Sequence, residues 1–109
     1  MMNKVLIVES DMDRAISIGI FLGRRSFHPV FAFSVREAWA EIYSQKPVLI
    51  CISRRLRGGT GDELLEEIRK QGYAMPVVML PETKGGDELF FFLIFVLSFW
   101  LGDMPLSFI

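Results

Sequence analysis

Hydrophobic residues along the chain gather in short unbroken runs that alternate with longer stretches of helical spacing. The runs are residues 4–8, 29–33, 48–52 and 76–80. Runs of this length are typical of strands that are buried on both faces of a sheet. The stretches with helical spacing are about residues 12–24, 35–46 and 61–71. Strands and helices that alternate with short links predict an α/β domain, with a parallel sheet and helices on both of its faces.

Local signals mark where the predicted helices start. The tetrapeptides at residues 34–37 (Ser-Val-Arg-Glu) and 60–63 (Thr-Gly-Asp-Glu) are capping boxes. In such a box the first hydroxyl accepts a hydrogen bond from the fourth backbone N–H, and the fourth side chain reaches back. Ser10 or Asp11 is suited to cap the first helix. Each predicted helix therefore has a polar residue that fixes its start.

Several polar or turn-forming residues directly follow the predicted strands. They are Glu9, Ser10, Ser53 and Pro81. Right-handed crossovers bring the carboxyl ends of all parallel strands to one edge of the sheet. Ligands of open α/β sheets bind at that edge. We therefore expect these four residues to lie near one another at the candidate functional site.

The basic segment after the third strand, Ser53 with Arg54 and Arg55, admits two interpretations. An unpaired basic edge attracts phosphate or carboxylate groups, which predicts a small anion site. Alternatively, Ser53 satisfies local backbone groups, and the arginines face solvent or pair with acids. The candidate acids are Glu63, Glu66 and Glu9. We favour the second interpretation.

Composition bounds the class of protein. The chain has 109 residues and a formal net charge of −1, which indicates one domain and argues against nucleic-acid binding through bulk charge. Its single cysteine, Cys51, lies inside an apolar run and has no partner for an internal disulfide. A cytoplasmic setting is therefore expected. The amino-terminal apolar run is short and ends in acids, so no signal peptide is expected.

The tail is compositionally unlike the rest, because residues 89–101 contain Ser98 as their only polar residue. A membrane-spanning helix needs about 20 apolar residues and usually has basic flanks, so membrane insertion is not expected. As part of the domain, residues from Asp87 onward would form a fourth helix, and residues 96–101 a fifth strand. Composition also leaves open that the tail is not a product of selection.

A fourth helix of this composition would be apolar on all sides, which indicates that another surface covers it. We therefore expect self-association, as a homodimer, through residues 87–109. The candidate interface residues are Phe90, Phe91, Leu93, Ile94, Leu97 and Trp100.

Three motifs together resemble the receiver domain of bacterial response regulators over residues 3–88. Residues 5–11 look like the first strand and its acidic cluster, residues 56–65 like the loop and helix start after the third strand, and residues 76–81 like the fourth strand. The resemblance implies a single domain with a doubly wound, flavodoxin-like sheet of order 2-1-3-4-5. The last helix would be absent or incomplete, and residues 89–109 would be an atypical tail.

The chemistry of the family can be carried over position by position. The phosphoacceptor aspartate is replaced by Ser53, and the acidic pair that holds Mg²⁺ by Glu9 and Ser10. The hydroxyl and lysine positions that respond to phosphate are occupied by Pro81 and Met104. Only Glu9 keeps its chemical character. A serine does not form an acyl phosphate, and a Mg²⁺ site built on Glu9 and Ser10 would be weak.

These departures predict a pseudo-receiver: a cytoplasmic, non-enzymatic module of phosphorelay signal transduction, without a resident cofactor, that binds a protein partner independently of phosphorylation. One alternative is a phosphoacceptor receiver of a two-component system that uses Asp11 or Ser53 unconventionally. Another is a membrane-associated adaptor held by the Phe-rich tail.

Overall fold

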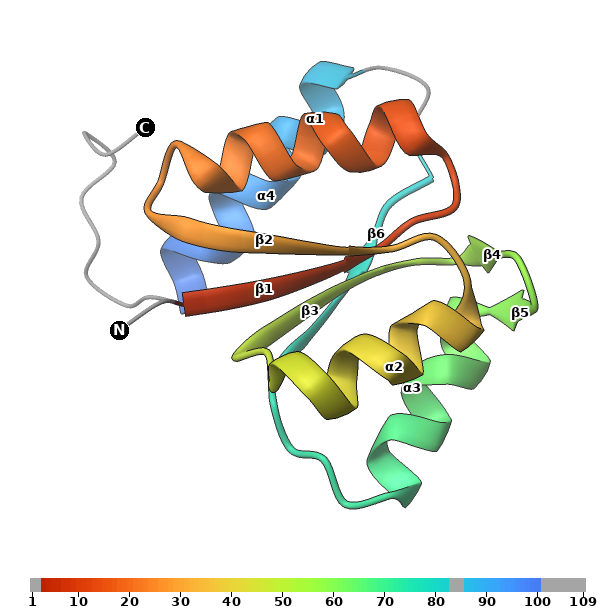
Figure 1. The fold of residues 1–109 in the computed structure, drawn as a ribbon. Coiled ribbons are helices and arrows are strands. Elements are labelled where there is room, and N and C mark those ends of the chain that lie inside the picture. Colours follow the sequence, from red (N-terminus) through yellow and green to blue (C-terminus); the bar gives the residue numbers. More distant parts are fainter. Residues whose placement is uncertain (1–2, 83–85, 101–109) are drawn as a thin grey trace.

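A computed structural model describes residues 3–82 and 86–100 (Figure 1). Its main strands are β1 (Asn3–Val8), β2 (Phe27–Ala32), β3 (Leu49–Ser53) and β6 (Val77–Leu80). Its helices are α1 (Met12–Gly23), α2 (Val35–Gln45), α3 (Gly61–Lys70) and α4 (Gly86–Trp100). Two short strands, β4 (Arg55–Leu56) and β5 (Gly59–Thr60), pair antiparallel in the loop after β3.

The main strands form a parallel sheet in the order β2-β1-β3-β6. In the register of the two central strands, Val5 is opposite Leu49 and Val8 is opposite Ile52. Residues 5–8 and 49–53 are all buried, as continuous apolar runs predict for central strands. The four predicted strands and the 2-1-3-4 part of the predicted order are therefore confirmed.

Alternate residues of the strands point into two separate cores, one on each face of the sheet. On one face, α1 and α4 cover Val5, Ile7 and Cys51. On the other face, α2 and α3 cover Leu6, Val8, Ala32, Ile50 and Ile52. Figure 1 shows α1 above the sheet and α2 and α3 below it. The doubly wound architecture predicted from the sequence is confirmed.

The fifth strand predicted at residues 96–101 is wrong for residues 96–100, which belong to α4, and Leu101 lies outside the described residues. The helix predicted from Asp87 onward is present, but it continues through Trp100. No Gly, Pro, Asn or Asp interrupts residues 88–100, so nothing ends the helix to let a strand begin. Within the described ranges, β6 is therefore an edge of the sheet.

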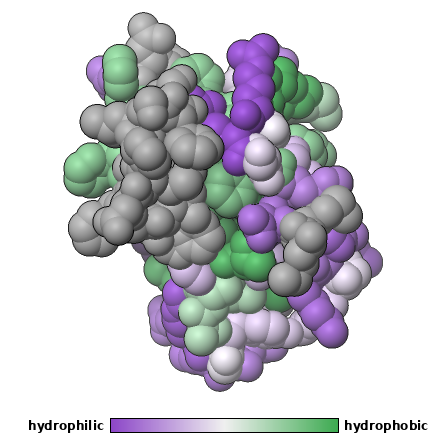
Figure 2. Space-filling model, turned by 90° about the vertical axis from the view of Figure 1, so that its left-hand side faces the viewer, coloured by the Kyte–Doolittle hydropathy of each residue, from purple (hydrophilic) through white to green (hydrophobic). Residues whose placement is uncertain are grey.

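Figure 2 looks at the end of the molecule from which the strands start, on the left of Figure 1. Hydrophobic side chains show in the middle of this end, with hydrophilic side chains above and below. At the opposite end, the chain leaves each strand through the loops that form the candidate site. The candidate site therefore lies at the end of the sheet that Figure 2 does not face.

The β4–β5 hairpin is held against the start of α3 by a close backbone approach. Gly61 donates a backbone hydrogen bond of 2.8 Å to the carbonyl of Arg54. A Cβ at position 61 would lie only 2.2 Å from the Ser53 carbonyl oxygen. Arg57 and Gly58 make the turn between the two short strands, and both Gly58 in the turn and Gly59 at the start of β5 have positive φ, of +89° and +153°. Glycine is therefore required where the site loop meets α3.

Replacing Gly61 by alanine tests this approach. We expect Gly61→Ala to lower the free energy of unfolding by about 2 kcal/mol or more, because a backbone atom must shift to admit the Cβ. The matched control is Gly23→Ala at the end of α1, where an added Cβ has no atom within 4 Å. It should be neutral or slightly stabilising. Urea unfolding curves measure both, and equal midpoints for the two variants would contradict the assignment.

Candidate functional site

The carboxyl ends of β1, β3 and β6 meet around an open cavity of about 360 Å³. It lies at the end of the sheet where β4 and β5 are seen in Figure 1. Its lining residues are Glu9, Arg14, Ser53, Arg54, Arg55, Leu80 and Glu82. The structure thus brings Glu9 and Ser53 together, as the strand ends predict.

The carboxylate of Glu9 is the centre of this site. Glu9 is 5% exposed, so its charge is almost fully removed from water. Its Oε1 accepts a hydrogen bond of 2.6 Å from the Ser53 hydroxyl, and its Oε2 accepts one of 3.2 Å from the Asp11 backbone N–H. Both carboxylate oxygens are therefore engaged by groups of the chain.

The charge of Glu9 is balanced by Arg14, which reaches back from the first turn of α1. Its Nε lies 3.2 Å from Glu9 Oε1, and its Nη2 donates a hydrogen bond to the Pro81 carbonyl. The Arg14 side chain is 22% exposed. The guanidinium group thus ties the end of β1 to the residue after β6.

Mg²⁺, which the receiver fold implies, does not fit these residues. A divalent cation needs hard oxygen ligands, but Glu9 already faces the cationic guanidinium of Arg14. Among the described residues, no group of three or more His, Cys, Asp or Glu side chains is placed to hold a metal ion. The cationic group beside Glu9 is therefore the guanidinium of Arg14, a side chain of the same protein.

Ser10 is used for structure rather than left open toward a ligand. Its hydroxyl donates a hydrogen bond of 2.8 Å to the Phe33 carbonyl and accepts one of 2.9 Å from the Arg57 N–H. It thereby joins the loop after β2 to the β4–β5 hairpin. Asp11, the second candidate for the helix cap, is the actual N-cap of α1, since its side chain accepts from the Arg14 N–H.

Ser53 bonds to a side chain rather than to the local backbone groups expected from the sequence. It is 5% exposed, and its hydroxyl proton is directed at Glu9. A carboxylate at hydrogen-bond distance is a group that accepts a proton from a hydroxyl. Here, however, that carboxylate is already held in an ion pair by the guanidinium group of Arg14.

The two arginines after Ser53 are paired, but their partners differ from the predicted ones. Arg54 Nη1 lies 3.2 Å from Asp62, and Arg55 Nε lies 3.4 Å from Glu82. Both pairs are exposed, since the side chains are 48% and 64% exposed in the first pair and 90% and 52% exposed in the second. The predicted partners Glu63, Glu66 and Glu9 were wrong, because Arg54 meets Asp62, the second residue of α3, and Arg55 meets Glu82 after β6. The Arg55 side chain does face solvent, as the same interpretation allowed. Pairing, rather than an open anion site, is the interpretation that these contacts favour.

Cys51, in the middle of β3, is a core residue. It is 1% exposed, and burial raises the pKa of its thiol to about 12. The thiol therefore remains neutral near pH 7, and it is not available as a nucleophile.

The candidate interface residues differ in burial. Leu93 is 1% exposed and belongs to the core between α4 and the sheet, so it is not an interface residue. Phe90 and Ile94 are half-buried, with the Phe90 ring stacked on Phe21 of α1 at 5.4 Å. Phe91 is 71% exposed. The side chains of Leu97 and Trp100 lie outside the described structure. Met104, the residue at the lysine position of the family, also lies outside it.

Sequence reasoning missed two residues. Phe95 is 71% exposed, one turn after Phe91, and forms with it an apolar surface on α4. Arg14 was missed at the site. The sequence held a feature that could have placed Arg14 there, because side chains in the first turn of a helix point back toward the helix N-terminus. Helix α1 begins at the edge where Glu9 lies.

Solved structures similar to this chain include receiver domains of response regulators. The Francisella response regulator 1452 receiver domain is 26% identical, with a TM-score of 0.70, over 79% of this chain and 71% of that one. A two-component response regulator from Clostridium difficile is 26% identical, with a TM-score of 0.69, over 80% of this chain and 71% of that one. A response regulator receiver protein from Methanoculleus marisnigri is 24% identical over its N-terminal domain, with a TM-score of 0.70, over 79% and 72%.

No protein-family model matches the chain, and no curated protein sequence matches it. The likeness to solved structures confirms the resemblance read from the sequence motifs: the chain is a receiver-like domain. It supports a response-regulator module of two-component signalling. In the part of the chain that the structure describes, no helix is long and apolar enough to cross a membrane.

Removing Arg14 tests how much the site depends on its guanidinium group. We expect Arg14→Ala to lower the free energy of unfolding by about 2 kcal/mol, because it leaves the buried charge of Glu9 without a cation. The matched control is Arg54→Ala, which breaks an exposed pair with Asp62 and should cost less than about 1 kcal/mol. Thermal unfolding at neutral pH compares the two variants, and an equal loss would contradict the central role of Arg14.

Proposed function

We propose that this chain is a pseudo-receiver, a cytoplasmic module of phosphorelay signal transduction that acts through protein–protein contact without being phosphorylated. It is not an enzyme in this proposal. The receiver fold supports its place in signalling, and the residues at the strand ends support the loss of phosphoryl chemistry.

The observation that carries the proposal is the closed chain of contacts from Ser53 through Glu9 to Arg14. Ser53 offers a hydroxyl where phosphoryl transfer in the family needs a carboxylate. Arg14 stands against the acid that would otherwise contribute to a metal site, and it also holds the carbonyl of Pro81. Each group that could take part in phosphoryl transfer is therefore engaged in the resting structure.

Intact-mass measurement tests the loss of phosphorylation. The chain is incubated with a small-molecule phosphodonor and Mg²⁺, and we expect an unchanged mass. The physical reason is that Ser53 has neither an acidic oxygen nor a free base, since Glu9 is paired with Arg14. An unrelated active receiver domain in the same tube shows that the donor works.

A stable phosphate adduct on this chain would contradict the proposal. Its position separates the remaining possibilities: Ser53 would indicate a hydroxyl acceptor, and Asp11 a carboxyl acceptor. Either position would favour the phosphoacceptor receiver. Flotation with lipid vesicles would instead favour the membrane-associated adaptor.

The proposal includes a homodimer formed through α4. Phe91 and Phe95 are each 71% exposed and lie one helical turn apart, which supports an apolar contact surface. Aromatic side chains, Phe among them, are enriched at the centre of protein–protein interfaces.

Light scattering at micromolar concentration tests the dimer. We expect the wild-type chain to have twice the monomer mass, and the variant with Phe91→Ser and Phe95→Ser to be monomeric, because it loses the apolar surface without touching the core. The matched control is Ile16→Ser with Ile20→Ser, which removes two apolar side chains that are 46% and 52% exposed on α1. This control should remain dimeric. A monomeric wild type would contradict the dimer.

A further inference from the structure

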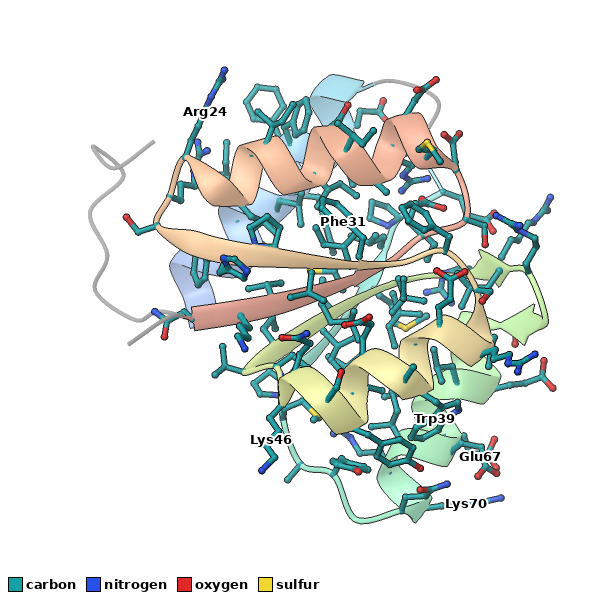
Figure 3. All side chains as sticks on the ribbon, in the orientation of Figure 1. Arg24, Phe31, Trp39, Lys46, Glu67 and Lys70 are labelled. Carbon is teal, nitrogen blue, oxygen red and sulfur yellow. The ribbon has the colours of Figure 1, made fainter. Side chains whose placement is uncertain are left out.

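A second hollow lies on the other side of the sheet from α4, between α2, α3 and the β4–β5 turn. Its volume is about 100 Å³. Its walls include the apolar side chains of Val35, Trp39 and Leu64 and the carboxylates of Glu63 and Glu67. Figure 3 shows Trp39 and Glu67 on this side of the molecule, below the sheet. None of its lining residues belongs to the cavity at the strand ends.

The aromatic wall of this hollow is held in place by two further rings. Trp39 stacks on Tyr43, with centroids 5.8 Å apart, and lies 6.5 Å from the ring of Tyr73. The Tyr43 hydroxyl donates a hydrogen bond of 3.1 Å to Gln71 after α3. Contacts from two separate segments therefore fix the indole. A fixed ring binds a ligand with little loss of conformational entropy.

The acidic wall has carboxylate oxygens left for a ligand. The hydrogen bonds described for Glu63 all fall on its Oε1, which accepts from the backbone and hydroxyl of Thr60. Glu67 shares Lys70 with Glu66, and Lys70 Nζ is closer to Glu66, at 3.4 Å, than to Glu67, at 3.7 Å. The lining contains two carboxylates and no basic side chain. The charge of the hollow is therefore complementary to a cation.

We propose that this hollow binds an arginine side chain presented by a basic segment of a partner protein. A guanidinium group is planar, so it stacks on an indole face while its N–H groups bind carboxylates at its edge. In this site, Trp39 supplies the indole face for stacking, and Glu67 supplies the carboxylate that binds the N–H groups. A hollow of about 100 Å³ has room for more than one water molecule, and a single guanidinium group takes the place of a few waters.

This surface is separate from the proposed dimer contact. Trp39 belongs to the face of the sheet that is covered by α2 and α3, and α4 packs on the opposite face. The arginine site therefore remains accessible in a dimer formed through Phe91 and Phe95, and its test does not depend on phosphorylation or on dimerisation.

Nuclear magnetic resonance with a minimal probe tests the inference. N-acetyl-L-arginine amide is titrated into the full chain, and the Trp39 indole N–H and the Thr60 backbone N–H are followed. We expect saturable shifts at both positions in the millimolar range. The citrulline analogue, which has the same shape without the charge, should give no saturable shift. Equal binding of arginine and citrulline would overturn the inference.

Glu67 and Glu66, which are neighbours on α3, supply a test variant and its matched control. Glu67→Gln removes a carboxylate that lines the hollow and should weaken arginine binding about threefold. Glu66→Gln removes the same charge, which also contacts Lys70, from a residue outside the lining. It should leave binding unchanged. Equal weakening by both variants would mean general attraction to an acidic helix and would overturn the site.

Discussion

The buried carboxylate of Glu9 is the constraint on which the arrangement of the strand ends depends. Removing a charge from water costs several kcal/mol unless it is paired and hydrogen-bonded. The chain meets this requirement with Ser53 from β3, the backbone of Asp11, and Arg14 from α1. Arg14 extends the network to Pro81. One buried acid thus sets the mutual positions of the ends of β1, β3 and β6.

The two faces of the sheet differ in what they leave exposed. The α1–α4 face buries Leu89 and Leu93 and leaves Phe91 and Phe95 to solvent, since a helix that is apolar all round buries only the stripe next to the sheet. The α2–α3 face leaves an aromatic and acidic hollow instead. These two surfaces have different chemistry, so they suit different partners.

Much of the fold followed from sequence because the short-range signals agree with one another. The apolar run at residues 48–52 predicted β3, and the Thr60–Glu63 capping box is formed in both directions. The apolar tail was harder, because a run without polar residues has no period that separates helix from strand. At the site, proximity of Glu9 and Ser53 followed from topology. Topology alone did not give the ion-pair partner of Glu9. The first-turn position of Arg14 brings its side chain toward this edge, but the choice of one partner among the charged residues there depends on three-dimensional geometry.

The identity of the cation at Glu9 decides how the strand ends can respond to a signal. A metal ion exchanges with solvent, and a phosphoryl group can be added and removed, so either can shift a population between two states. Arg14 is covalently part of the chain, and a guanidinium group keeps its charge in proteins. The ion pair with Glu9 is therefore constant under conditions in which a metal-dependent site would change. Under the proposed function, any change of state in this domain enters through a contact surface, where a partner with different affinities for the two states supplies the free energy.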